Sequence, residues 1–244
     1  MTHANLFYEV TPPSKWSTRW ELERTVKDAL EAGAIGLDIT DSPTGESHSS
    51  SLAASVFAKL AYHANVICHI RTRDVTSMGL RSLVRACSVW EVENILFVMG
   101  EGSESTGLTP TAAINIVRSE GILNDRSVKL GLIVDPRRPT SLQRKMATRP
   151  DFIYSAPVTS QTEAEFLEEV SSKSGCELYA GLLVNSPLNK PILSRIGVNQ
   201  DFEGLVDWKL VDTLKAISSV LILMSPADPD SGISVLREVR TRGL

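Results

Sequence analysis

The sequence contains little that would tie the chain to disulfides or metals. Only three of its 244 residues are cysteines, Cys68, Cys87 and Cys176, and they lie far apart with no CxxC spacing. An odd number of separated cysteines argues against a disulfide framework and offers no zinc motif. No histidine pair has the spacing of metal ligands, and neither a P-loop nor a GxSxG motif occurs. We therefore expect a cytoplasmic protein with buried, reduced thiols and no metal.

Long apolar runs and basic clusters are also missing. No apolar run approaches the roughly 20 residues of a membrane helix. The first ten residues, MTHANLFYEV, lack the basic start and apolar stretch of a signal peptide. The net charge is −4, and no basic block is interleaved with aromatic residues. These absences argue against a membrane and against nucleic acid as partners.

What the sequence does contain is a regular series of short apolar runs typical of buried strands. There are eight of them: NLFYEV (5–10), IGLDITD (35–41), NVICHIRT (65–72), NILFVMG (94–100), VKLGLIV (128–134), DFIYSAPV (151–158), ELYAGLLV (177–184) and SVLILMS (219–225). Amphipathic, helix-like stretches separate them, as in residues 20–33, where Leu22, Val26 and Leu30 recur at spacing four.

Eight strands that each precede a helix, over about 250 residues, are typical of a (β/α)8 TIM barrel. We therefore predict an α/β protein with one domain over residues 1–244. An open, doubly wound sheet is the alternative fold. It would require neither eight units nor their even spacing.

Polar residues gather where the predicted strands end. In a barrel, the carboxyl ends of the strands form the active-site floor. The residues at these ends are Glu9, Asp38, Asp41, His69, Arg71, Arg73, Asp74, Glu101, Asp135, Arg137, Arg138, Ser155, Asn185 and Ser225. The strand starts are mostly apolar, and this asymmetry indicates an enzyme active site.

Each of these residues also has a structural interpretation. Glu9 could form an internal ion pair with Arg71, and His69 alone could be a core histidine. Glu101 follows Gly100, which allows close approach of a ligand to the backbone, but the pair could equally be a plain acidic turn.

Two further segments are similarly ambiguous. In the segment DPRRP, Asp135 and Arg137 indicate either a tight turn or an anion clamp. Asp41 could only cap the loop that follows it.

The ordered segments resemble those of one known family. FYEVTPP, LDITDSP, CHIRTRDVT, NILFVMGEG and RKMATRPDFIYSAPV are similar, in this order, to segments of methylenetetrahydrofolate reductases. Order and spacing agree over roughly the first two thirds of the chain. The resemblance implies a (β/α)8 barrel that reduces 5,10-methylenetetrahydrofolate to 5-methyltetrahydrofolate, with FAD carrying a hydride from NAD(P)H.

The resemblance also implies roles for individual residues. Glu9 matches the family's general acid at the pterin, and Glu101 matches a carboxylate that lies near flavin and pterin, so both are catalytic candidates. His69 matches a histidine beside the flavin. The full set of binding candidates is His69, Arg71, Gly100 and Asp135 for cofactor, and Asp41, Ser155, Asn185 and Arg137 for the folate substrate.

The chain departs from the family at points that bear on flavin. Met99-Gly100-Glu101 stands where the family has Arg-Gly-Asp, so a cation that helps to hold flavin is missing. Either Tyr154-Ser155 or Ser155-Ala156 stands where the family has Thr-Gln, so a pterin-binding glutamine is missing.

Two alternatives therefore stay open beside the reductase. The first is a folate-dependent methyltransferase without flavin, working with a methyl-acceptor protein. The second is a non-catalytic barrel subunit of a larger complex. A homo-oligomer is compatible with each.

Overall fold

The protein is a closed barrel of eight parallel strands. The computed structural model describes residues 4–14, 18–101, 107–123, 128–195, 197–198 and 202–242. The strands pair in chain order, and β8 closes the barrel on β1. They are β1 (Asn5–Val10), β2 (Gly36–Ile39), β3 (Asn65–Arg71), β4 (Asn94–Val98), β5 (Lys129–Val134), β6 (Phe152–Ser155), β7 (Glu177–Leu183) and β8 (Val220–Met224). The predicted (β/α)8 barrel is confirmed, and the open-sheet alternative is wrong.

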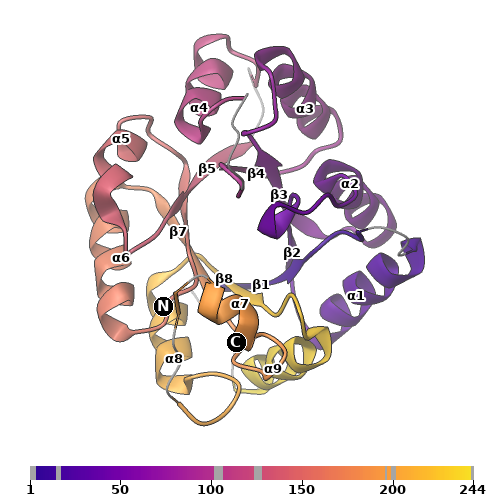
Figure 1. Ribbon diagram of the computed structural model, residues 1–244, viewed down its shortest axis with the longest axis vertical. Helices are drawn as coiled ribbons and strands as arrows, with labels where there is room; N and C mark the ends of the chain where they lie inside the picture. Colours follow the sequence, from indigo (N-terminus) through magenta and orange to yellow (C-terminus); the bar gives the residue numbers. More distant parts are fainter. Residues whose placement is uncertain are drawn as a thin grey trace.

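Helices surround the barrel as an outer layer (Figure 1). They are α1 (Arg19–Ala32), α2 (Ser51–Tyr62), α3 (Ser77–Val89), α4 (Pro110–Ser119), α5 (Leu142–Met146), α6 (Gln161–Ser174), α7 (Lys190–Arg195), α8 (Trp208–Ile217) and α9 (Pro229–Thr241). Two 3₁₀ turns, η1 (Pro43–Gly45) and η2 (Pro139–Ser141), follow β2 and β5. In Figure 1, α7 lies closer to the barrel axis than α8, which belongs to the outer ring. Within the described ranges, no helix is both long and apolar enough to cross a membrane.

Local sequence explains where the helices begin and end. Hydroxyl and carboxylate side chains accept hydrogen bonds from backbone amides in the first turn of several helices, which satisfies donors that have no partner inside the helix. These N-cap residues are Ser50, Thr76, Thr109, Ser160, Asp207 and Asp228. Helices α1 and α6 end at Gly33 and Gly175 in the left-handed conformation, which glycine adopts without steric cost.

The apolar side chains form two separate layers. The outer layer lies between strands and helices, and the inner layer fills the barrel. Inside the barrel, the rings of Phe152 and Tyr179 stack with centroids 4.2 Å apart. Gly36 and Gly131 leave room for the rings of Phe7 and Phe152. These packed layers make a rigid floor beneath the carboxyl ends of the strands.

Candidate active site

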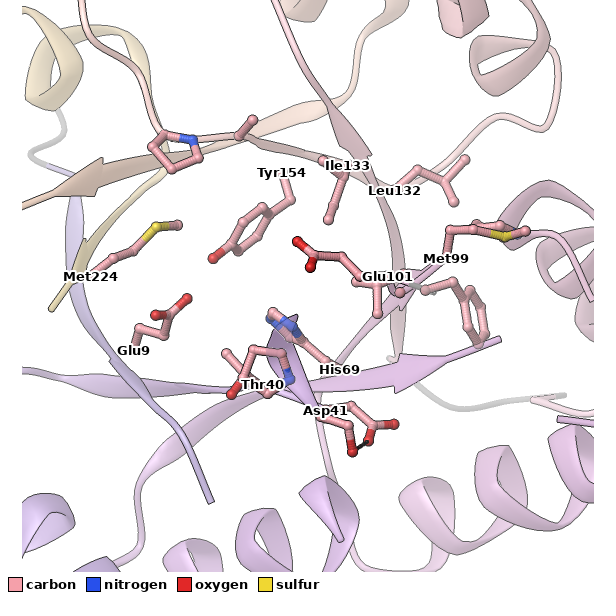
Figure 2. A pocket seen from close by; sticks show the side chains of 18 of the residues that line it. Glu9, Thr40, Asp41, His69, Met99, Glu101, Leu132, Ile133, Tyr154 and Met224 are labelled. Carbon is pink, nitrogen blue, oxygen red and sulfur yellow. Dashed lines mark hydrogen bonds between the residues drawn. The ribbon is translucent and has the colours of Figure 1, made fainter. Parts of the chain in front are cut away.

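A cavity of about 820 Å³ opens at the carboxyl ends of the strands. Figure 2 shows Glu9, His69, Glu101 and Tyr154 pointing into one space, with Ile133 and Met224 on its walls. Its lining thus combines a polar floor with apolar sides, as small-molecule sites usually do. Five residues assigned to the site from the sequence line this cavity together: Glu9, Asp41, His69, Gly100 and Glu101.

Glu9 lies on β1, and its side chain lines the cavity. Its side chain is half-buried, and it pairs in register with Asp38 on β2. Burial raises the pKa of Glu9 from 4.5 to about 8, and the charge of Asp38 adds to this rise while His69 opposes it. The carboxyl group of Glu9 is therefore largely protonated at neutral pH and can donate a proton.

A fully buried carboxylate, Asp38, joins two rings of the cavity floor. Nε2 of His69 lies 2.7 Å from Oδ1 of Asp38, and the hydroxyl of Tyr154 donates to Oδ2 at 2.7 Å. Burial alone would lower the pKa of His69, but the charge and hydrogen bond of Asp38 overcome this effect and raise it. The pKa of Tyr154 is raised, first by burial and then by Asp38 and Glu9. Tyr154 therefore stays a hydrogen-bond donor.

Arg71 fastens the loops that border the cavity. Its Nε lies 2.5 Å from Oδ2 of Asp74, and its guanidinium donates to the carbonyls of Ser42 and Glu101 at 3.3 and 2.9 Å. Gly100 has a φ of 77°, and a Cβ there would lie 2.6 Å from Nε of Arg71. These contacts hold the loops after β2 and β4 to β3, and they occupy the guanidinium that the sequence offered as a partner for Glu9.

The two acids at the rim differ in how they are held. Glu101 is exposed, and Figure 2 shows its side chain directed toward the middle of the cavity. Asp41 also lines the cavity, but its carboxylate accepts hydrogen bonds from the amide of Arg71 at 2.9 Å and the hydroxyl of Ser42 at 3.3 Å. Asp41 thus organises the loop after β2, whereas Glu101 is accessible to a ligand.

Arg71 and four other site candidates do not line the cavity. Asp135 pairs with Arg137, whose Nε lies 2.9 Å from its Oδ1. The hydroxyl of the buried Ser155 accepts a hydrogen bond from the amide of Gly181, and Asn185 donates to two backbone carbonyls of the segment 202–204. These contacts give each residue a structural partner. Their assignment to ligand binding stays a prediction.

Several residues in the cavity lining or directly beneath it had no specific role assigned from the sequence. Asp38 and Tyr154 belong to strands far apart in the chain, and only the closed barrel brings them together. Arg144 and Lys145 on α5 lie at the cavity wall beyond β5, and Nζ of Lys145 donates to the carbonyl of Ile133 at 2.7 Å. The basic pair in SLQRKM is visible in the sequence, but not its position at the cavity. Among the residues that the structure describes, no group of histidines, cysteines and acids is arranged to hold a metal.

Fold and site together define a (β/α)8 barrel with a carboxylate-rich cavity, and solved structures share this architecture. An uncharacterized protein from Clostridium thermocellum that binds two copies of 5-methyl-5,6,7,8-tetrahydrofolic acid has a TM-score of 0.71 and 16% identity. The match covers 98% of this chain and 96% of that chain. Tryptophan synthase from M. tuberculosis matches with a TM-score of 0.58 and 12% identity, covering 98% of this chain and 92% of that chain. No family model and no curated protein sequence matches the chain. The two likenesses show the fold.

Proposed function

We propose that the protein is an enzyme of one-carbon metabolism that binds a reduced folate in the barrel cavity and transfers its methyl group. The observation that carries the proposal is the position of Glu9, whose carboxyl group strand β1 presents to a cavity with a polar floor and apolar walls, where burial raises its pKa to about 8. General acids work best when their pKa lies near the ambient pH, and Glu9 satisfies this condition. The similar barrel from C. thermocellum, which binds 5-methyltetrahydrofolic acid, supports the choice of ligand.

The cavity suits a folate in size and in polarity. Its volume of about 820 Å³ lies within the range of about 300–1,000 Å³ usual for small-molecule sites. The pterin has an amide and amino edge that fits the polar floor near Glu9 and Glu101. Apolar walls suit the benzoyl ring, and Arg144 at the wall offers a cation to the anionic glutamate tail.

The proposed step moves one methyl group and one proton. An electron pair of an acceptor nucleophile forms the new bond to the methyl carbon, while the N5–methyl bond of 5-methyltetrahydrofolate breaks. The pair of the broken bond stays on N5, which takes the proton of Glu9, so tetrahydrofolate leaves uncharged at N5. Glu9 regains its proton from solvent. The cysteines Cys68, Cys87 and Cys176 are buried and do not line the cavity, so the nucleophile belongs to another molecule, such as a thiolate or a reduced cobalt centre.

The described lining does not fit a dinucleotide flavin bound beside a folate. Met99 offers no charge to a flavin where the related segments carry arginine, and Arg71 is engaged by Asp74 and two loop carbonyls. Among the described lining residues, the basic side chains other than histidine are Arg144 and Lys145. A pyrophosphate and a folate tail would compete for this pair.

Reduction of 5,10-methylenetetrahydrofolate is the second candidate function. The resemblance of five ordered segments to methylenetetrahydrofolate reductases favours it. Acid catalysis by Glu9 would help the imidazolidine ring to open, and the hydride would come directly from NAD(P)H. The two candidates share the ligand class and the acid, and they differ in the source of the electrons.

Calorimetry with 5-methyltetrahydrofolate tests the ligand. We expect saturable binding, and a hundredfold excess over Kd should stabilise the fold by about 2.7 kcal/mol and raise its melting temperature by about 5–10 °C. Arg144→Ala should weaken binding about two- to fivefold at low salt, because an exposed ion pair contributes about 0.2–1 kcal/mol. Arg85→Ala, which removes an exposed arginine away from the cavity, is the matched control. Absence of heat and of stabilisation at millimolar ligand would rule out a folate protein.

The absorbance of the purified protein and two turnover assays separate the candidate reactions. For methyl transfer, we expect a colourless protein that demethylates 5-methyltetrahydrofolate when a thiol or a cobalamin acceptor is added. For reduction, the protein would oxidise NAD(P)H when 5,10-methylenetetrahydrofolate is present, and a yellow preparation would contradict the argument against flavin. Tight folate binding without turnover in either assay would contradict both and favour the non-catalytic subunit.

A further inference from the structure

We propose that Asp38 is a positioning residue, which orients His69 and Tyr154 as one unit on the floor of the cavity. The inference rests on the proposed function and adds a positioning role for Asp38 that the sequence did not assign. Asp38 does not line the cavity, so it acts through the two rings that do.

The geometry gives Asp38 a partner for each oxygen. Oδ1 accepts a hydrogen bond from Nε2 of His69, and Oδ2 accepts one from the hydroxyl of Tyr154, both at 2.7 Å. Asp38 itself has no exposed surface, and His69 and Tyr154 are 6% and 3% exposed. A buried carboxylate is costly unless its oxygens are hydrogen-bonded, so this arrangement is held firmly.

The two rings also contact each other. Their centroids lie 5.6 Å apart, and their planes are nearly perpendicular at 87°. The carboxylate bridges their polar ends, so the two aromatic side chains from β3 and β6 are fixed by three mutual contacts. With Nε2 of His69 engaged as a donor to Asp38, Nδ1 is the ring nitrogen left for a ligand.

Asparagine at position 38 cannot reproduce this arrangement. Its amide has one oxygen acceptor, and its NH₂ group requires an acceptor, so either His69 changes tautomer or the Tyr154 hydroxyl turns round to accept. Asp38→Asn therefore preserves volume while it changes the hydrogen bond to at least one of the rings. Misplacement of reacting groups by about 1 Å costs about 10²-fold in rate. We expect a similar loss of turnover, with less than about a tenfold change in the Kd for 5-methyltetrahydrofolate.

The charge of Asp38 adds a readout that a purely structural residue would not affect. The titratable groups that face it are Glu9 on β1, His69 on β3 and Tyr154 on β6. Turnover that needs protonated Glu9 falls as the pH rises through about 8. Without the Asp38 charge, the pKa of Glu9 is less elevated, so in Asp38→Asn this alkaline limb should move to lower pH.

The experiment combines kinetics with nitrogen-15 NMR of the labelled histidines, in which the His69 signals are identified by comparison with His69→Gln. In the free protein, we expect the His69 titration to move to lower pH in Asp38→Asn. We also expect less than additive losses of turnover for Asp38→Asn combined with Tyr154→Phe. Asp151→Asn is the control. That aspartate accepts a backbone hydrogen bond at the opposite end of the barrel, so the substitution should affect stability but not the pH profile.

Each outcome of the experiment either supports or overturns the positioning role of Asp38. An unchanged His69 titration and an unchanged pH profile in Asp38→Asn would overturn the positioning role. A changed titration with normal turnover of folate would also overturn it, because the rings would then be displaced without consequence. If the wild-type protein neither binds nor converts folates, the proposed function fails. The NMR titration alone then tests whether Asp38 orients the two rings, and an unchanged His69 titration in Asp38→Asn would overturn the proposal.

Discussion

Replacement of Glu9 by glutamine is expected to lower single-turnover rates by about 10²–10⁴-fold, which is the usual contribution of general acid catalysis. Glutamine keeps the size of the side chain and much of its hydrogen bonding but cannot supply the carboxylic proton. Folding should be preserved, and binding of 5-methyltetrahydrofolate should weaken only modestly. Rapid-quench kinetics and melting temperature, measured on the same preparation, check both expectations.

The control for Glu9 is another half-buried strand glutamate. Glu177 begins β7 at the opposite end of the barrel, where it lies 2.5 Å from Nζ of Lys129. Glu177→Gln should therefore affect stability and leave the rate per folded molecule unchanged. A Glu9→Gln protein that is strongly destabilised but turns over normally would show that Glu9 is structural.

The pH dependence of stability provides an independent measurement on Glu9. Below pH 4.5 its carboxyl group is protonated in both the folded and the unfolded chain. Between pH 4.5 and about 8 the unfolded chain releases this proton while the folded protein retains it, so the free energy of unfolding falls as the pH rises. Glu9→Gln should remove this loss, so the variant gains stability relative to the wild type up to about pH 8.

Substitution of Gly131 by valine is expected to destabilise the fold by about 3 kcal/mol, at the upper end of usual overpacking costs. A Cβ at Gly131 would overlap the ring of Phe152, which is already stacked on Tyr179. For a chain of this size, the melting temperature should fall by about 6–12 °C. Thermal or denaturant unfolding measures the loss.

A matched glycine tests the steric explanation for Gly131. A Cβ at Gly181 would meet chiefly the flexible end of Met224, so Gly181→Ala should cost less than Gly131→Ala. Combining Gly131→Val with Phe152→Ala should cost less than the sum of the single losses, because the truncated ring makes room. If Gly131→Val melted like the wild type, the inner layer would be packed differently.

The architecture could be predicted from the sequence because it depends on local patterns. Each strand is a short apolar run, and the helices between them show regular amphipathic spacing or capping residues. The predicted runs extended beyond the observed strands, as in 151–158, where β6 ends at Ser155 and α6 begins at Gln161. Strand ends are determined by pairing with neighbours, which a single sequence does not display.

The lining of the cavity was predictable where a residue follows the end of one strand. Glu9, His69 and Glu101 follow this rule, and the closed barrel places them around one cavity. The partnership of Asp38 with Tyr154 was not predictable, because it depends on the register across the barrel interior. The partners of the arginines could not be predicted for a different reason. A flexible cation reaches several acceptors, and Arg71 and Arg137 are held by nearby acids.

The position of Arg71 has a consequence for how this barrel can change its specificity. One guanidinium joins the segments after β2 and β4 to β3, and Gly100 leaves room for its stem. The two rim segments are therefore structurally coupled through Arg71. A replacement for either segment keeps this link only if its backbone places a carbonyl within reach of the Arg71 guanidinium. A change of ligand preference through one rim segment is therefore constrained by the backbone path that Arg71 requires.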